Sequence, residues 1–163
     1  MKKLYIVRHA KSSWDFPHLE DYERPLSERG ETDAPLMAAY VKKRVACPQI
    51  FISSHALRAV TTALEFMKAL NVSENEIQKK KELYHATRRN WFKMIRVIDD
   101  RFDTVMLCGH NPGLTDFVNE ISGADIYNIP TCGVAGINFE INSWNDIEAE
   151  KGKLEHYYFP KGI

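Results

Sequence analysis

Short continuous apolar runs alternate along the chain with segments whose apolar residues recur at helical spacing, and this alternation constrains the fold more than any other feature. The runs at 4–7, 49–53 and 104–108 are typical of buried strands. The segments at 57–70 and 91–98 show the spacing of amphipathic helices. Strands that alternate with helices predict a largely parallel sheet with helices on both faces.

The segment from 10 to 25 shows no apolar period and predicts a long loop after the first strand. Loops of this length are commonly functional. The helix that follows has two candidate N-caps, Ser27 and Asp33. We expect Leu36, Tyr40 and Arg44 to mark one face of this helix.

Two later segments predict where secondary-structure elements begin. The polar stretch 73–81 reads as a connection that leads to a short element near Leu83. After the strand at 104–108, Asn111 is the predicted N-cap and Pro112 the predicted first residue of the next helix.

The end of the chain differs from the rest, because 133–141 and 153–159 look like two strands joined by the polar stretch 142–152. No repeat or linker divides the 163 residues, a length that fits one domain. We therefore expect a single domain over 1–163, with a three-layer α/β/α fold, a mostly parallel sheet and an antiparallel C-terminal hairpin at one edge.

Overall charge and cysteine content exclude several kinds of partner and cofactor. The 22 basic and 22 acidic residues balance, so no long-range field attracts nucleic acid or an anionic membrane, and any anion site must be built locally. The three cysteines form no CxxC pair, which disfavours a disulfide framework and structural zinc. The run at 4–7 is too short for a signal core or a membrane span. We expect a cytoplasmic protein without cofactor or metal.

Polar clusters follow three of the predicted strands, at Arg8-His9, at 55–58 and at His110-Asn111. Because the carboxyl ends of parallel strands meet at one edge of the sheet, where helix N-termini also point, these clusters should converge. Arginines and histidines without a set of metal-binding carboxylates suit a dianion. Phosphate is the natural ligand for such a site.

The chain resembles the histidine phosphatase superfamily, and within it the short SixA-like phosphohistidine phosphatases, which implies a phosphoglycerate mutase-like fold. The resemblance covers nearly the whole chain in family order: Arg8-His9-Ala10, Arg24-Pro25-Leu26 ahead of Arg29-Gly30, 53–59 with Thr62-Ala63, and 109–112. One position departs from the pattern: His55 stands where the family usually has proline, which leaves Arg58 in register.

Each residue of the predicted site has a role. A neutral imidazole can attack phosphorus in line and hold the phosphoryl group, so His9 is the predicted nucleophile. Phosphoryl transfer otherwise needs positioning and charge stabilisation, which Arg8, Arg58 and His110 can supply as catalytic and substrate-binding groups. The resemblance implies that Arg24 is a further phosphate ligand.

The proton donor for the leaving group is the least defined part of the site. In the wider superfamily a carboxylate after the second helix often serves, and Glu82 stands at that place, although it equally fits an exposed charge after the lysines at 79–81. His85 and Asp15 are weaker alternatives. A basic leaving group, such as the imidazole of a phosphohistidine, departs comparatively easily and makes a dedicated acid less necessary.

These residues predict a metal-independent phosphatase that forms a phosphohistidine intermediate on His9. By resemblance, its substrate is phosphohistidine on a partner protein. Only 51 residues, 59–109, separate Arg58 from His110, which leaves little chain for a lid and favours an open site. The alternatives are a phosphatase of a small phosphorylated metabolite, such as a sugar phosphate, and a non-catalytic phosphate-binding module.

Overall fold

A mixed sheet of six strands forms the centre of the computed structural model, which describes all residues from 1 to 163. In chain order the strands are β1 (Lys2–Arg8), β2 (Ile50–Ser54), β3 (Ile77–Lys80), β4 (Thr104–Gly109), β5 (Val134–Phe139) and β6 (Gly152–Tyr158). Their order across the sheet is β3-β2-β4-β1-β5-β6. The pairs β1–β4, β4–β2 and β2–β3 are parallel, whereas β5 runs antiparallel to both β1 and β6. The hairpin therefore lies at one edge, as predicted.

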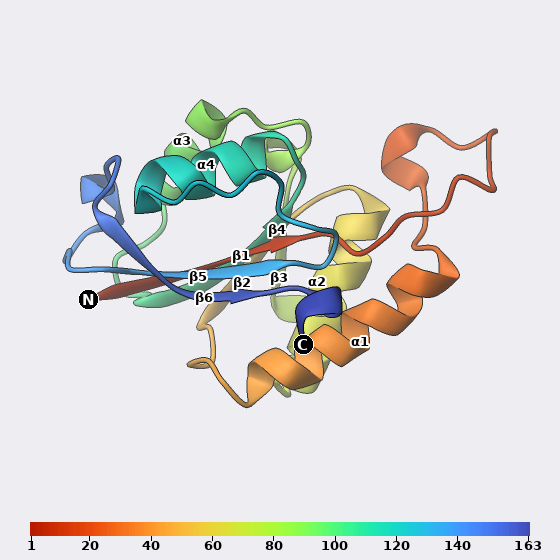
Figure 1. Cartoon of the computed structure of the whole chain (residues 1–163), viewed down its shortest axis with the longest axis horizontal. Coiled ribbons are helices and arrows are strands. Elements are labelled where there is room, and N and C mark those ends of the chain that lie inside the picture. Colours follow the sequence, from red (N-terminus) through yellow and green to blue (C-terminus); the bar gives the residue numbers. More distant parts are fainter.

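Four helices cover the two faces of the sheet and complete the three layers that the sequence predicts. They are α1 (Glu28–Lys42), α2 (Leu57–Ala69), α3 (Arg88–Arg96) and α4 (Gly113–Ser122). Figure 1 shows α3 and α4 over one face and α1 and α2 over the other. Each pair covers its own apolar cluster, with Trp91 and Phe117 in the first and Met37 and Phe66 in the second. None of the helices combines the length and apolar character needed to cross a bilayer.

The first helix differs from the prediction in its buried face. Its N-cap is Ser27, whose side-chain oxygen accepts a hydrogen bond from the Gly30 N–H. Leu36, predicted to mark one face of the helix with Tyr40, is 50% exposed, and Tyr40 is only half-buried. The buried apolar positions of this helix are Ala34, Met37, Ala38 and Val41. The prediction favoured large side chains, whereas small alanines allow the close packing of α1 against α2.

Two boundary predictions were also wrong. The stretch 73–81, predicted as a connection, contains β3, an edge strand whose backbone pairs with β2 while polar side chains face the solvent. Helix α4 begins at Gly113 rather than at Pro112. The side-chain oxygen of Asn111 accepts the Thr115 N–H at 3.1 Å, four residues on, so it supports the helix start without being the N-cap.

Glycine is required where loops pack directly against the starts of two helices. A Cβ on Gly30 would lie 2.1 Å from the carbonyl oxygen of Lys11, and one on Gly113 would lie 1.9 Å from that of Ala86. No larger side chain fits these approaches. The glycines thereby fix the loop after β1 and the segment before α3 beside the carboxyl edge of the sheet.

Candidate active site

The carboxyl ends of β1, β2 and β4 bring together polar side chains that are far apart in sequence. β1 and β4 pair with Arg8 opposite Gly109, so His9 and His110 leave neighbouring strands side by side. Their ring centroids lie 5.2 Å apart. Arg58 enters from the first turn of α2 and Arg24 from the loop after β1, and the positive charges of Arg8, Arg24 and Arg58 all act on His9. The three predicted polar clusters therefore meet at one place.

His9 is held with one ring nitrogen bonded and the other free. The side chain is only 9% exposed, and its Nδ1 lies 2.7 Å from the carbonyl oxygen of Ala10. A carbonyl can only accept, so Nδ1 carries the proton and Nε2 holds a free lone pair. Burial, together with the neighbouring arginine charges, lowers the pKa of His9 to about 4. The ring is therefore neutral at physiological pH.

His110 presents a buried nitrogen that lacks a partner. Its Nε2 lies 2.8 Å from the Ser54 hydroxyl oxygen, which also accepts the N–H of Ala56. The hydroxyl can then donate to Nε2, an arrangement that favours a proton on Nδ1. Nδ1 has no protein partner. Burial and the charge of His9 lower the pKa of His110 to about 2, so it too stays neutral.

Arg8 has a second unpartnered nitrogen in the same region. Its Nη1 donates to the carbonyl oxygen of Ile129 at 2.8 Å, which fixes the guanidinium, while its buried Nε has no partner. Buried donors without partners are costly. Arg8 Nε and His110 Nδ1 are therefore both available to donate to an anion.

Arg24 is buried in the long loop and held on all sides. Its Nε donates to the carbonyl oxygen of Ser13 at 3.0 Å, and its Nη2 donates to the Ser12 hydroxyl. Its Nη1 donates to Asp21 at 2.8 Å. The ring of Trp14 lies over the guanidinium, 3.4 Å from its central carbon. The side chain is thus fixed rather than solvated.

Asp21 is the residue of this cluster that sequence reasoning missed. Its carboxylate accepts from Arg24, from Arg58 Nη2 at 2.9 Å and from the Tyr84 hydroxyl, and its carbonyl oxygen accepts from Arg58 Nη1 at 2.7 Å. Partial burial raises the pKa of Asp21, but these hydrogen bonds outweigh it and hold the pKa well below its usual range. One acidic residue in a loop with several others carries no periodic signal that could have identified it.

An aromatic wall borders the cluster and includes the position that departs from the family pattern. The His55 ring stacks on Tyr22 at a centroid distance of 5.4 Å and meets the edge of Tyr84 at 5.1 Å. Tyr84 also lies 5.5 Å from His110. His55 therefore packs in the turn before Arg58 and leaves Arg58 inside the cluster.

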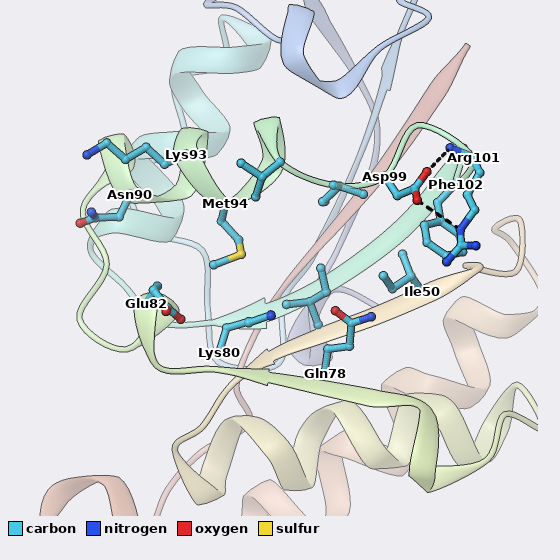
Figure 2. Close-up of a pocket in the computed structure, with 13 residues that line it drawn as sticks. Ile50, Gln78, Lys80, Glu82, Asn90, Lys93, Met94, Asp99, Arg101 and Phe102 are labelled. Atoms are coloured by element: carbon cyan, nitrogen blue, oxygen red, sulfur yellow. Dashed lines mark hydrogen bonds and ion pairs between the residues drawn. The ribbon is translucent and has the colours of Figure 1, made fainter.

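Glu82 lies outside these contacts. It lines a groove between β3 and α3, called here the β3–α3 groove, with a volume of about 530 Å³. Figure 2 shows Glu82 beside Lys80 at one end of the groove and Met94 on its helical side. Tyr84, two residues later, is the side chain of this segment that reaches Asp21. The other suggested donors, Asp15 and His85, are both exposed.

The cluster combines a neutral imidazole with a free lone pair, three fixed guanidinium groups and unpaired buried nitrogens. Such a set can bind a phosphoryl group and stabilise charge on its oxygens during attack by His9. No group of three or more His, Cys, Asp or Glu side chains is placed to hold a metal. All three cysteines are free.

Comparison with known proteins identifies a matching family model and relatives in sequence. Residues 4–93 match the family model of the histidine phosphatase superfamily, branch 1. An uncharacterised chloroplast protein of Arabidopsis thaliana is 32% identical, over 98% of this chain and 78% of its own length. An uncharacterised protein of Mycobacterium leprae is 27% identical, over 95% of this chain and all of its own.

Solved structures share the fold over almost the whole chain. A protein of Agrobacterium tumefaciens, provisionally described as the phosphohistidine phosphatase SixA, matches with a TM-score of 0.83 and 26% identity over 98% of both chains. The protein histidine phosphatase SixA in complex with tungstate matches with a TM-score of 0.81 and 20% identity, over 98% of this chain and 97% of its own. A mycobacterial glucosyl-3-phosphoglycerate phosphatase matches with a TM-score of 0.69 and 14% identity, over 96% of this chain and 98% of its own.

Proposed function

Because the chain belongs to the histidine phosphatase superfamily, we propose that it is a metal-independent phosphatase with His9 as its nucleophile, acting as one catalytic domain over residues 1–163. The observation that carries the proposal is the state of His9. Its Nδ1 bond to Ala10 and its low pKa leave a neutral Nε2 among three arginines. A neutral nitrogen with a free lone pair is what attack on phosphorus requires.

In the first step the Nε2 lone pair forms a bond to phosphorus while the bond to the leaving group breaks. The phosphoryl group is then held on His9, and the Nδ1 proton stays on the ring. The Ala10 carbonyl supports the positive charge that this ring gains. Arg8, Arg24, Arg58 and His110 bind the phosphoryl oxygens and stabilise their charge.

In the second step a water oxygen attacks phosphorus and the bond from phosphorus to Nε2 breaks. The bonding electrons return to the His9 ring, which becomes neutral again, and inorganic phosphate leaves with one proton of the water while the other passes to solvent. The phosphorylated ring is a good leaving group because it is cationic. The low pKa of His9 favours its return to the neutral form.

The surroundings of His9 favour phosphohistidine as the substrate. Asp21 is ionised at neutral pH, and Glu82 faces the β3–α3 groove, so neither is placed to protonate a poor alkoxide leaving group. An imidazole leaves without that help once its other nitrogen is protonated. The site thus suits a phosphoramidate better than a sugar ester.

The rim of the site favours a protein as the carrier of that phosphohistidine. The loop after β1 projects beyond the carboxyl edge of the sheet (Figure 1), and it exposes Trp14, Phe16 and Tyr22, with Trp14 73% exposed. Exposed aromatic side chains around a polar centre are common where proteins bind each other. A sugar phosphate, the alternative substrate, is too small to cover these three side chains.

The test compares kcat/KM for a phosphohistidine-bearing carrier protein with kcat/KM for a panel of small phosphate esters, each with and without EDTA. We expect the phosphoprotein to be preferred, and chelation to change no rate. Phe16→Ser should weaken turnover of the phosphoprotein alone, because Phe16 is an exposed side chain of the loop and is not one of the proposed phosphate ligands. Equal or faster turnover of one ester would favour the metabolite phosphatase, and activity that needs a divalent ion would contradict the mechanism.

A further inference from the structure

Asp21 joins three side chains that come from separate parts of the chain. Arg24 belongs to the loop after β1, Arg58 to the start of α2, and Tyr84 to the segment after β3, and all three donate to the one carboxylate. Arg58 makes two hydrogen bonds to Asp21, because its second terminal nitrogen donates to the Asp21 carbonyl oxygen at 2.7 Å. Asp21 therefore links the two arginines through one carboxylate.

The charge states within this network are well defined. Hydrogen bonds from Tyr84 and the two arginines outweigh partial burial and hold the pKa of Asp21 well below its usual range. Burial and the Asp21 carboxylate raise the pKa of Tyr84. At neutral pH the pair is a carboxylate that accepts from a phenol, and neither group readily gives or takes a proton.

Enough donors remain on the two arginines to bind a phosphoryl group. A guanidinium has five N–H donors. Arg58 directs two of them to Asp21, and Arg24 directs three to Ser12, Ser13 and Asp21. Three N–H donors of Arg58 and two of Arg24 therefore remain for a phosphoryl group.

We propose that Asp21 is a positioning residue for the proposed phosphatase reaction: it aligns Arg24 and Arg58 before the phosphoryl group binds, and Tyr84 fixes the carboxylate in that role. The inference rests on the proposed function, since the arginines are taken as phosphate ligands. Pre-aligned donors lose little conformational freedom on binding, and their charge is already directed at the transition state.

A competing account is that the Asp21 carboxylate occupies the phosphate position and must leave when the substrate binds. The contacts disfavour this account, because Asp21 reaches neither Arg8 Nε nor His110 Nδ1, the unpaired nitrogens beside His9. The two accounts predict opposite changes in anion affinity when the Asp21 charge is removed. Loss of a negative charge that competes with phosphate strengthens anion binding, whereas loss of a positioning residue weakens it.

The experiment replaces Asp21 by asparagine and measures binding of inorganic phosphate by calorimetry, inhibition by vanadate, and kcat and KM on one small phosphate compound. Asp21→Asn should weaken vanadate and phosphate binding about tenfold, or about 1.4 kcal/mol, and lower kcat by a similar factor. Glu23→Gln is the matched control, because it removes the same charge from an exposed side chain two residues away and should change nothing. Unchanged or tighter anion binding by Asp21→Asn overturns the proposal.

A second variant separates positioning from simple packing. Tyr84→Phe keeps the ring against His55 and His110 and removes only the hydroxyl, so we expect a loss of a few fold in the same direction. In the Asp21→Asn background the same change should have almost no further effect. Additive losses would show that Tyr84 does not act through Asp21. If the native protein hydrolyses no phosphate compound, the proposed function fails, while phosphate calorimetry still tests the alignment of the arginines.

Discussion

The β3–α3 groove and the cluster around His9 differ in the polarity, the burial and the hydrogen bonding of their side chains. The groove is roomy, with an apolar floor that includes Ile52 and Met94, and charged side chains such as Lys80 at its border. In the cluster around His9 the two imidazoles, Arg24 and Arg58 are buried, and the polar groups are held by hydrogen bonds. Oriented, partly unpaired polar groups therefore mark the candidate chemistry, whereas the groove holds no such set of oriented groups.

The strongest test of this contrast removes the proposed nucleophile. His9→Ala should lower kcat by at least about 10³-fold, because the other imidazole of the cluster, that of His110, engages its Nε2 with the Ser54 hydroxyl. Circular dichroism and thermal unfolding check that the fold is kept. Acid quenching of the native protein with labelled substrate should leave the label on His9. Near-normal turnover by the variant would remove His9 from the mechanism.

A smaller loss is expected from Arg58→Lys, which keeps the charge. An ammonium cannot reproduce the two bonds that Nη1 and Nη2 make to Asp21 and still face the phosphoryl group. We expect a loss of about 10²-fold, or about 2.7 kcal/mol, largely in kcat. Arg88→Lys on the exposed side of α3 is the control. A raised KM with unchanged kcat would show that Arg58 only holds the substrate.

The buried histidines also predict how stability depends on pH. His9 has a pKa of about 4 in the folded protein, so between pH 6.5 and 4 the unfolded chain binds a proton that the folded chain does not. The free energy of unfolding should therefore fall as the pH is lowered from 7 to 5, by on the order of 1–2 kcal/mol from His9. Urea unfolding at the two pH values measures this fall. His9→Gln should show a smaller fall than the native protein, and an equal fall would contradict the assignment.

The smallest effect is expected on the groove side. Glu82→Gln should change kcat/KM by less than about twofold between pH 5 and 8, because Glu82 faces the β3–α3 groove rather than His9. If Glu82 were the general acid, its replacement would instead lower kcat/KM about 10²-fold or more and remove the basic limb of the pH profile. That result would mean that the groove and the cluster around His9 form one site in the working enzyme.

Much of the fold could be predicted because short-range patterns in the sequence specify its strands and helices. The runs that become β1, β2 and β4 are continuous and apolar, and burial on both faces demands that pattern. The parallel order of these strands then predicts where Arg8, His9 and His110 gather. The buried face of α1 could not be predicted from the local pattern. Burial of Ala34 and Ala38 depends on how closely α2 packs against α1, which the sequence of α1 does not encode.

The amino-acid sequence predicts the layers, the hairpin edge and the meeting of His9, Arg58 and His110, because the apolar pattern of each strand is local and these residues lie just after strands whose carboxyl ends share one edge of the sheet. The contacts of the folded chain were needed to show that Asp21 joins Arg24 to Arg58 and that Tyr84, unlike Glu82, contacts the cluster. These contacts form between segments up to 63 positions apart, and a hydrogen bond depends on distance and direction in space. No spacing along the chain encodes either quantity.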